Sequence, residues 1–589
     1  MSHVPHTLRA GNWEITLSAD GAISSARVCG TEVLHGLIIA VRDDKWETVP
    51  ASVEVHSVDV NEHGFSVKIH ATHSGGDVRF EWDGRLTGGP EGITMDFDGI
   101  AVTDFPSNRI GFVALHPLTW AGRAVTIVHS DGSTSESIYP VAVSPHQPFL
   151  DVVGFRQATD DGLVSIDFGG DVFETEDQRN WSDASYKTYS RPLSLPFPVI
   201  WKKGDTAHQS VRLGFEPYSA SVATTNRVEL EREDVNLQLG ESVSLPSVGL
   251  TLGPDDDLAA LTPEIAALAP DFLRVDLVAG DELGGVHVLR DALTLPVIPL
   301  QLTLHVGKHP TAALEELRDV LEGESARVTA IAILDSEAPA TTERVVSAVR
   351  SILGEVIDGI PLIVGTDDNL AELNRNPVSL HELGASAVTF CLNPGVHDLR
   401  SVSMLETPDA LPAMVETARS LAGGPVVLGP LTLRPRRNLY RAGVRIDRTG
   451  RDASATDERQ HSAVAAAWLI ATLGAAVAAG VTAVSLFEIS GPRGIVASPG
   501  GARYPLFDVI AELGAADHAV GCVMDRPSDV AALALANDSG AVTTLLLANR
   551  TDTEQTIVLA ESGERHVLAP FGAEIIRRDA PLPGQEGTQ

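Results

Sequence analysis

The chain has 589 residues, of which 43% are hydrophobic and 21% are charged, and its 79 acidic and 43 basic side chains give a formal net charge of −36. This length exceeds a single hydrophobic core, so several domains are expected. The acidic balance disfavours nucleic-acid and anionic-membrane partners. Three cysteines far apart in the sequence (Cys29, Cys391 and Cys522) disfavour a disulfide framework. No signal-peptide pattern opens the sequence, so we expect a cytoplasmic protein. The sequence indicates no oligomeric state.

The N-terminal third consists of short alternating runs. Between Thr7 and about Glu216, segments such as WEITLS and FSVKIHATH are bounded by Gly, Asp, Asn or Pro. Alternation with period two and frequent turn residues is typical of antiparallel sheets packed face to face. We therefore predict an N-terminal antiparallel β-sandwich over residues 1–225.

The middle region, residues 226–516, alternates apolar strand-like runs with helix-like segments. The eight runs are VGLTL (248–252), FLRVDL (272–277), VIPLQLTLHV (297–306), VTAIAIL (328–334), PLIVG (361–365), SAVTFCL (386–392), PVVLGPLTL (425–433) and VTAVSLF (481–487). Continuous β-branched runs indicate strands buried on both faces. Eight βα units in roughly 250 residues predict a (β/α)8 TIM barrel. A doubly wound open sheet is the alternative, disfavoured by the strand count and by the lack of GxGxxG after the first run.

Short strands return near the C-terminus. The runs VAALALAN, AVTTLLLAN and QTIVLAE predict a small C-terminal β-sandwich over residues 517–580, followed by a disordered tail at 581–589. The long apolar stretch 463–487 is interrupted by Gly474 and Gly480. It is therefore interpreted as a buried helix followed by a buried strand, and not as a membrane span.

The reactive groups of a barrel lie at the carboxyl ends of its strands and in the loops that follow. In chain order these positions hold Asp335 and Glu337; Asp367, Asp368, Asn369, Glu372, Asn374 and Arg375; Asn393, His397, Asp398 and Glu406; Thr432, Arg434 and Arg436; and Glu488 and Arg493. Glu488 directly follows a mostly apolar run, where a carboxylate needs a partner or a function. Glu372 fits a solvated carboxylate in a first helical turn equally well.

The remaining candidates also have structural interpretations. Arg434 fits a buried ion pair as well as a catalytic role. A single loop histidine such as His397 is commonly just solvated. Asp335, Asp367 and Asp398 are more typical of turn caps than of catalytic groups.

Taken together, these side chains suit hydrolysis of a polyhydroxylated substrate. Carboxylates accept hydrogen bonds from sugar hydroxyls and act as general acid or base, and arginine stabilises an oxyanion. The sequence has no specific metal signature, no P-loop and no GxSxG elbow, so we expect neither cofactor nor metal, and a serine-triad esterase is disfavoured.

A retaining glycosidase is a second interpretation, and it needs two carboxylates. In the large barrel clan of such enzymes they end strands four and seven. Glu337 ends the fourth run, but the seventh ends in TLRPRRN and supplies no acid. If VGLTL is not strand one, Glu372 and Glu488 move to strands four and seven and the glycosidase interpretation regains support.

One segment carries a family resemblance. FETEDQRNWSDASYKTYSRPLSLPFP (173–198) is similar to the FEMEDQRNWTDASFKTY signature of D-apionate lactonases. NRIGFVALHPL (108–118), GTDDNLAELNRN, NPGVHDLRSVSMLET, LTLRPRRN, DERQHSAVAAAWLIATLG and FEISGPRG also resemble that family, in the same order. The resemblance implies an N-terminal β domain, a barrel, a C-terminal β domain, and opening of D-apionolactone to D-apionate in apiose catabolism.

The resemblance also implies site residues. The matching positions in 173–198 are Glu174, Asp177, Arg179, Asn180, Trp181, Asp183 and Lys187, which suggest either a lid over the barrel mouth or an interdomain salt-bridge cluster. Those in the barrel are Glu372, Asn374, Arg375, His397, Glu406, Arg434, Arg436, Arg459 and Glu488.

Our hypothesis is metal-independent hydrolysis of a sugar lactone. Glu372 or Glu488 activates water, the other protonates the ring oxygen, and Arg434 and His397 stabilise the oxyanion. We expect further residues to bind substrate. In the barrel they are Glu337, Asn374, Arg375 and Arg436, and in 173–198 they are Glu174, Asp177, Arg179, Asn180, Trp181 and Lys187. The alternatives are a glycoside hydrolase of a related barrel family and a non-catalytic carbohydrate-binding protein.

Overall fold

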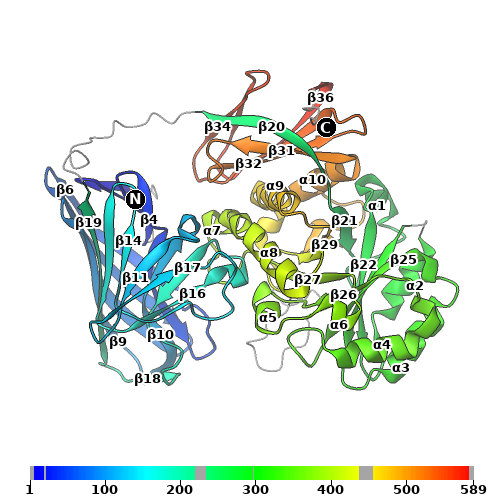
Figure 1. The fold of residues 1–589 in the computed structure, drawn as a ribbon, viewed down its shortest axis with the longest axis horizontal. Coiled ribbons are helices and arrows are strands. Elements are labelled where there is room, and N and C mark those ends of the chain that lie inside the picture. Colours follow the sequence, from blue (N-terminus) through cyan, green and yellow to red (C-terminus); the bar gives the residue numbers. More distant parts are fainter. Residues whose placement is uncertain (1–5, 19–20, 219–233, 296–297, 437–455, 583–589) are drawn as a thin grey trace. The chain divides into compact units, whose positions relative to one another are not determined.

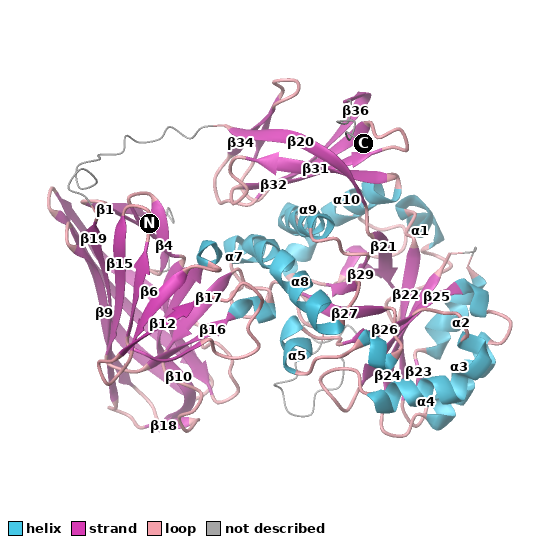
Figure 2. Ribbon diagram, viewed as in Figure 1, coloured by secondary structure: helices cyan, strands magenta, loops and turns pink. Residues whose placement is uncertain are grey.

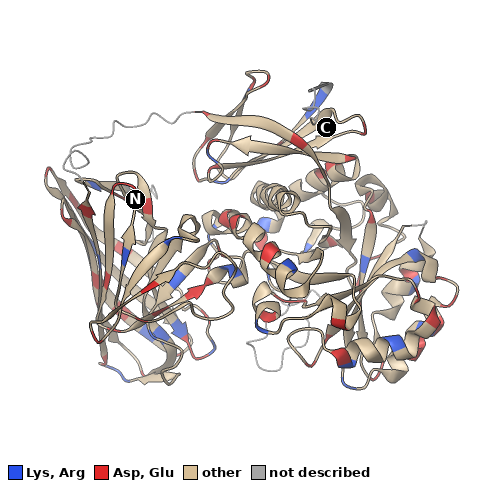
Figure 3. Cartoon of the chain, in the orientation of Figure 1, with Lys and Arg blue, Asp and Glu red and all other residues tan. Residues whose placement is uncertain are grey.

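The computed structural model describes residues 6–18, 21–218, 234–295, 298–436 and 456–582 (Figure 1). The chain divides into two compact units. The first contains Met1–Gln178 and Ser185–Glu231, and the second contains Arg179–Ala184 and Arg232–Gln589. Asp and Glu residues are spread over both units (Figure 3).

The first unit contains two large, mainly antiparallel sheets (Figure 2). One has the order β1 (His6–Ala10), β2 (Trp13–Leu17), β3 (Ile23–Val28), β5 (Gly36–Asp43), β10 (Phe105–Pro117), β17 (Ser185–Tyr189), β16 (Phe173–Asp177) and β13 (Phe149–Val152), with β4 (Thr31–Leu34) beside β3 and β18 (Val199–Trp201) beside β10. The other has the order β12 (Thr134–Ile138), β11 (Ala124–Val128), β14 (Gly154–Ala158), β15 (Gly162–Gly169), β19 (Thr206–Pro217), β9 (Gly92–Ala101), β8 (Val78–Gly89), β7 (Gly64–Gly75) and β6 (Ala51–Asn61).

The alternation in the sequence explains how these sheets pack. Along β8, Val78, Phe80 and Trp82 are buried and the residues between them are more exposed, so one face of the strand is apolar. Phe97 of β9 and Phe112 of β10 meet edge to face at 5.2 Å, which joins the inner faces of the two sheets. The predicted N-terminal β-sandwich is confirmed.

The second unit is built around a closed parallel barrel. Its strands are β21 (Ser247–Thr251), β22 (Phe272–Ala279), β24 (Leu300–Val306), β25 (Val328–Asp335), β26 (Leu362–Gly365), β27 (Ala387–Leu392), β28 (Val426–Leu431) and β29 (Ala483–Ser490). β21 pairs with both β22 and β29, which closes the ring. Two short strands, β23 (Leu283–Gly284) and β30 (Gly494–Val496), extend it. The eight predicted runs are therefore the eight barrel strands, and VGLTL is the first.

Helices follow the barrel strands on the outside. They are α1 (Thr262–Leu268), α2 (Val286–Thr294), α3 (Thr311–Leu321), α4 (Glu343–Leu353), α5 (Leu370–Arg375), α6 (Leu380–Leu383), α7 (Ser401–Glu406), α8 (Leu411–Ala422), α9 (Ala463–Ala478) and α10 (Pro505–Gly514). Most of α9 is buried because it packs against α8, α10 and two strands of the C-terminal sheet, β32 (Val530–Ala536) and β33 (Val542–Asn549). This packing explains its apolar sequence. Within the described ranges, no helix is long and apolar enough to cross a membrane.

The C-terminal sheet has the order β35 (Arg565–Leu568), β34 (Gln555–Leu559), β20 (Val235–Ser244), β31 (His518–Met524), β32, β33 and β36 (Ala573–Leu582). The sequence placed 235–244 at the start of the barrel region, but β20 pairs with β31 and β34 instead. Its alternating burial, typical of a strand with one buried face, explains this difference. β36 extends to Leu582, two residues into the predicted tail, and residues 583–589 lie outside the described residues.

Candidate active site

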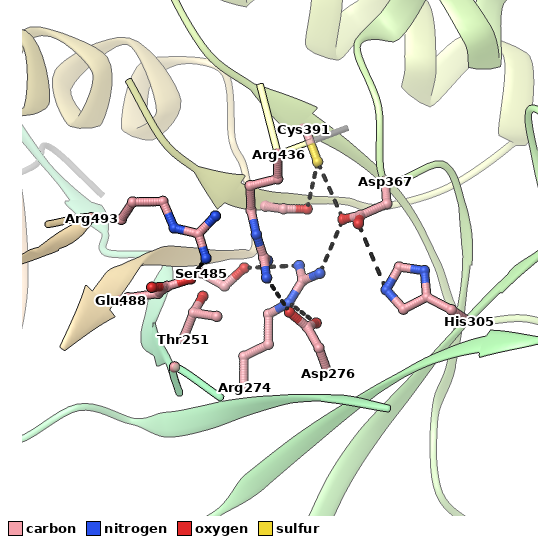
Figure 4. Close-up of polar contacts among 12 residues, drawn as sticks. Thr251, Arg274, Asp276, His305, Asp367, Cys391, Arg436, Ser485, Glu488 and Arg493 are labelled. Atoms are coloured by element: carbon pink, nitrogen blue, oxygen red, sulfur yellow. Dashed lines mark hydrogen bonds and ion pairs between the residues drawn. The ribbon is translucent and has the colours of Figure 1, made fainter. Parts of the chain in front are cut away.

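The barrel interior is polar near the carboxyl ends of its strands. On β22, Arg274 and Asp276 alternate with apolar residues that face the helices. Arg274 Nε donates to Asp276 Oδ1 at 2.8 Å, and Arg274 Nη2 donates to Asp367 Oδ1, after β26, at 3.1 Å. Arg436, after β28, pairs with Asp276 Oδ2 at 2.8 Å. His305 Nε2, on β24, lies 3.6 Å from Asp367 Oδ2 (Figure 4). Two strands and two loops therefore contribute to one buried network.

Charge pairing stabilises this network. Burial alone would raise the pKa of the Asp276 carboxyl, but Arg274 and Arg436 outweigh burial and hold that pKa far below its usual range. Burial would likewise raise the pKa of the Asp367 carboxyl, but nearby cations, chiefly Arg274, lower it instead. Burial would lower the pKa of Arg436, and the three nearby carboxylates (Asp276, Asp367 and Glu488) raise it instead. All these groups therefore stay ionised at neutral pH, and each buried charge has a partner.

Cys391 lies in the same interior, where its surroundings disfavour the thiolate form. Its Sγ is 3.4 Å from Asp367 Oδ1 and 3.5 Å from the carbonyl oxygen of Gly429. Burial, together with the charge of Asp367, raises the pKa of the thiol well above its usual value. A protonated thiol is a weak nucleophile.

Glu488 is the carboxylate at the end of β29, the eighth barrel strand. Its Oε1 accepts a hydrogen bond from Arg493 Nη2 at 2.6 Å, and Oε2 accepts none from the described residues. Two residues further on, Ser490 Oγ donates to Asp256, in the loop after β21, at 2.5 Å. Burial raises the pKa of Asp256, and the charge of Glu488 raises it further. The predicted requirement for a partner at Glu488 is met by Arg493.

Arg434 lies at the rim of the barrel. Its Nε is 3.1 Å from Asp457 Oδ2, and Arg459 binds both oxygens of the same carboxylate. A Cβ atom added to Gly395 would lie 3.2 Å from Arg434 Cδ, so the loops after β27 and β28 touch here. Arg434 therefore takes part in an ion pair, and its guanidinium lies beside the His397 loop.

The segment Arg179–Ala184 lies against α5 and the loop after β27, all within the second unit. Asn374 Nδ2 donates to Asn180 Oδ1 at 3.0 Å, and the Arg375 guanidinium lies 5.0 Å from the centre of the Trp181 ring. His397 Nδ1 is 2.6 Å from Asp183 Oδ2, and the His397 and Trp181 rings meet edge to face at 5.3 Å. Six candidates from distant parts of the sequence are thus brought together: Asn180, Trp181, Asp183, Asn374, Arg375 and His397. Arg179 belongs to the same segment.

Two further barrel candidates lie on α5 and in the loop after β25. Glu372 is half-buried in the first turn of α5, as the sequence indicated. Glu337 is exposed in the loop after β25, and its backbone N–H donates to Asp335 Oδ1 at 2.9 Å. Asp335 and Asp398 cap turns as expected. Asp367 does not, because its carboxylate is in the ion pair with Arg274.

The other candidates of the 173–198 segment belong to the first unit. Glu174 accepts hydrogen bonds from Tyr189 Oη at 2.6 Å and from the Leu193 N–H at 2.8 Å. Asp177 accepts one from the Ser144 N–H at 2.9 Å. Lys187 is paired with Glu176, and burial lowers its pKa. The contacts described for these three residues therefore lie within the first unit.

The sequence analysis missed Arg274, Asp276 and His305. All three lie within strands, whereas the barrel rule points to the strand ends and the loops that follow them. Their signal is visible in FLRVDL and QLTLHV, where polar residues occupy every second position of otherwise apolar runs. In a barrel strand, alternate residues face the interior. No group of three or more metal-ligating side chains occurs within the described part of the chain.

Comparison with known families agrees with this architecture. Models of the D-apionate lactonase N-terminal domain, TIM barrel domain and C-terminal immunoglobulin-like domain match residues 1–218, 248–518 and 527–578. The chain belongs to the D-apionate lactonase family. The D-apionate lactonase of Brucella anthropi is 28% identical over 614 residues, which cover 98% of this chain and 97% of that protein. The family's barrel match begins at β21 and therefore leaves out β20.

Solved structures resemble parts of this family member more weakly. A family 51 α-L-arabinofuranosidase from Bifidobacterium longum is 12% identical, with a TM-score of 0.38 over 60% of this chain and 98% of that one. A putative aldose 1-epimerase from Escherichia coli K12 is 10% identical, with a TM-score of 0.27 over 36% and 99%. Similarities this low carry no information on activity.

Proposed function

We propose that this protein hydrolyses a sugar lactone, D-apionolactone, to D-apionate. The observation that supports this most strongly is the family match over the N-terminal, barrel and C-terminal regions. The polar carboxyl end of the barrel supplies ionised carboxylates and cationic donors, which lactone hydrolysis needs. We also propose a cytoplasmic location, on the basis of the few, widely spaced cysteines.

The proposed reaction adds water across the ring ester. A base removes a proton from water while the water oxygen attacks the carbonyl carbon, and the carbonyl electron pair moves onto its oxygen. When this pair returns, the bond from carbon to the ring oxygen breaks, and an acid protonates that oxygen. The new carboxylic acid then ionises, so each turnover releases one proton.

We assign the base to Glu488. Arg493 holds its Oε1, and Oε2 has no hydrogen-bond partner among the described residues, so this oxygen can bind the attacking water. Glu488 also lies close enough to Arg436 to interact with it electrostatically. We assign the acid to Glu372, which lies in α5, the helix after β26. It would protonate the departing ring oxygen. These assignments require one carboxylate on each side of a bound lactone.

The oxyanion is assigned to His397 and Arg434. Their loops are in contact at Gly395, so the two side chains can approach one oxygen from neighbouring positions. Arg436, Asn374, Arg375 and Trp181 are proposed to bind the sugar hydroxyls and the ring. Binding of substrate by Glu174, Asp177 and Lys187, which belong to the first unit, stays a prediction from the family resemblance.

The strand count argues against a retaining glycosidase. VGLTL is strand one, so Glu372 follows strand five and Glu488 ends strand eight. The seventh strand, β28, is followed by Thr432, Leu433 and Arg434 and supplies no nucleophilic carboxylate.

The test is proton release from D-apionolactone by chelator-treated protein, with aryl glycosides as parallel substrates. Rapid acidification with intact glycosides supports the proposal. Glycoside cleavage without lactone opening would refute it, and binding of sugar without any turnover would favour a non-catalytic carbohydrate-binding protein.

A further inference from the structure

A short segment far from the barrel in sequence holds one of the proposed catalytic groups. His397 Nδ1 lies 2.6 Å from Asp183 Oδ2, with 19% and 13% of the two side chains exposed. Trp181 packs edge to face against the same imidazole at 5.3 Å. His397 Nε2 has no partner among the described residues. The ring is therefore held on two sides and open at one nitrogen.

We propose that Asp183 is a positioning residue that fixes His397 with Nε2 directed at the reacting carbonyl oxygen of the lactone. This inference rests on the proposed function. It adds to the active site a carboxylate that lies more than two hundred positions before His397 in the sequence.

Hydrogen-bond chemistry sets the orientation. An ionised carboxylate only accepts, so His397 carries a proton on Nδ1 and donates it to Asp183. The contact with Trp181 restricts rotation of the ring about χ2. Nε2 is then the nitrogen left for the ligand. A half-buried pair of this kind is less screened by solvent than one on an open surface.

The segment itself is fixed to the barrel loops. Ser182, between Trp181 and Asp183, has φ of 71°, a left-handed conformation that is uncommon for serine. Its Oγ donates to the carbonyl oxygen of Asn393 at 2.9 Å. The hydrogen bond from Asn374 holds Asn180, two residues before Ser182. A strained residue held by such contacts is typical of sites where the position of a neighbouring side chain matters.

In the proposed reaction His397 keeps its protons. As the carbonyl electron pair moves onto oxygen, that oxygen accepts a hydrogen bond from Nε2–H, while Nδ1–H stays bound to Asp183. A ring that donates from both nitrogens is cationic, and Asp183 is the counter-ion of this form. When the electron pair returns to carbon, the hydrogen bond from Nε2 weakens again.

The experiment compares Asp183→Asn, Asp183→Glu, His397→Gln and the double variant Asp183→Asn/His397→Gln on D-apionolactone. We expect kcat to fall about a hundredfold in the first and third variants, with KM within about threefold of wild type, since oxyanion donors act in the transition state. Asp183→Glu should recover part of the rate. The double variant should be no slower than His397→Gln, because Asp183 acts through His397.

The matched control is Asp83→Asn, which removes the carboxylate that lies 2.9 Å from His70 Nδ1 on an exposed sheet of the first unit. This variant should keep wild-type kcat. In parallel, ¹⁵N spectra of histidine-labelled protein report the ring directly, with His397 assigned from its absence in His397→Gln. Wild type should show a protonated, hydrogen-bonded Nδ1 that is altered in Asp183→Asn.

Wild-type kcat in Asp183→Asn, or additive losses in the double variant, would overturn the inference. If Asp183→Asn fails to fold, the Asp183→Glu rate and the wild-type spectrum still decide it, because a bare Nδ1 in wild type contradicts the pairing. Absence of lactone hydrolysis by wild type would instead refute the proposed function and leave the spectroscopic test intact.

Discussion

Replacing Glu488 by Gln tests the assigned base. Gln keeps the shape of the side chain and an acceptor for Arg493, which now donates to Oε1 at 2.6 Å, but it cannot take a proton from water. Loss of a general base lowers rates by about 10²–10⁴. At about 1.4 kcal/mol per tenfold, this is roughly 3–5 kcal/mol of transition-state stabilisation. We expect kcat and kcat/KM to fall together by at least a hundredfold, with KM nearly unchanged.

The assay is steady-state proton release at fixed pH, with thermal unfolding of each variant measured alongside. The matched control is Glu264→Gln on α1, a buried glutamate whose Oε1 accepts a hydrogen bond from the Gly500 N–H at 2.8 Å. This control makes the same change of charge at a position we assign no catalytic role, and it should keep kcat within about twofold of wild type.

Two results would refute the reasoning. Near-wild-type kcat in Glu488→Gln removes this carboxylate from proton transfer. An equal loss of rate in Glu264→Gln shows that the effect comes from removal of any buried glutamate, and not from chemistry at the barrel mouth.

Three further predictions follow from the same structure. Glu372→Gln should lower kcat on the order of a hundredfold if this residue protonates the ring oxygen; unchanged kcat would return Glu372 to a solvated first-turn carboxylate. Cys391→Ser should leave kcat unchanged. Iodoacetamide at pH 8 should not label Cys391 in the folded wild-type protein, because the raised pKa keeps the thiol protonated. Labelling of Cys391, checked by mass spectrometry, would contradict this prediction. Burial lowers the pKa of His116 from 6.5 to about 3. The neutral buried ring therefore contributes stability to the first unit above pH 6.5, and this stability is lost as pH falls toward 3, by about 2 kcal/mol between pH 6.5 and 5. Urea unfolding of His116→Gln should show a smaller loss of stability over this range than wild type.

Much of the fold could be predicted because each class of strand leaves its own pattern. The barrel strands are continuous apolar runs, such as VTAIAIL and SAVTFCL, and the sandwich strands alternate. β20 was assigned to the wrong region because an alternating strand does not reveal its partner. VNLQLGESVS pairs with one strand almost three hundred positions away and with another more than three hundred positions away, and only long-range pairing decides this.

The candidate site was only partly predictable for a related reason. Glu488 and Arg434 follow strand ends, where the barrel rule applies, and both lie where that rule places them. Which charges pair depends on the barrel register, which aligns Arg274 with Gln301 of the next strand and brings its guanidinium to Asp367. The contact between Asp183 and His397 depends on a segment of distant sequence, and no local pattern encodes it.

The most direct test of the account is the initial rate of proton release when D-apionolactone is added to the wild-type protein after chelator treatment. We predict one proton per lactone opened, at a rate that Glu488→Gln reduces at least a hundredfold. No proton release above the spontaneous rate, or equal rates for wild type and Glu488→Gln, would contradict it.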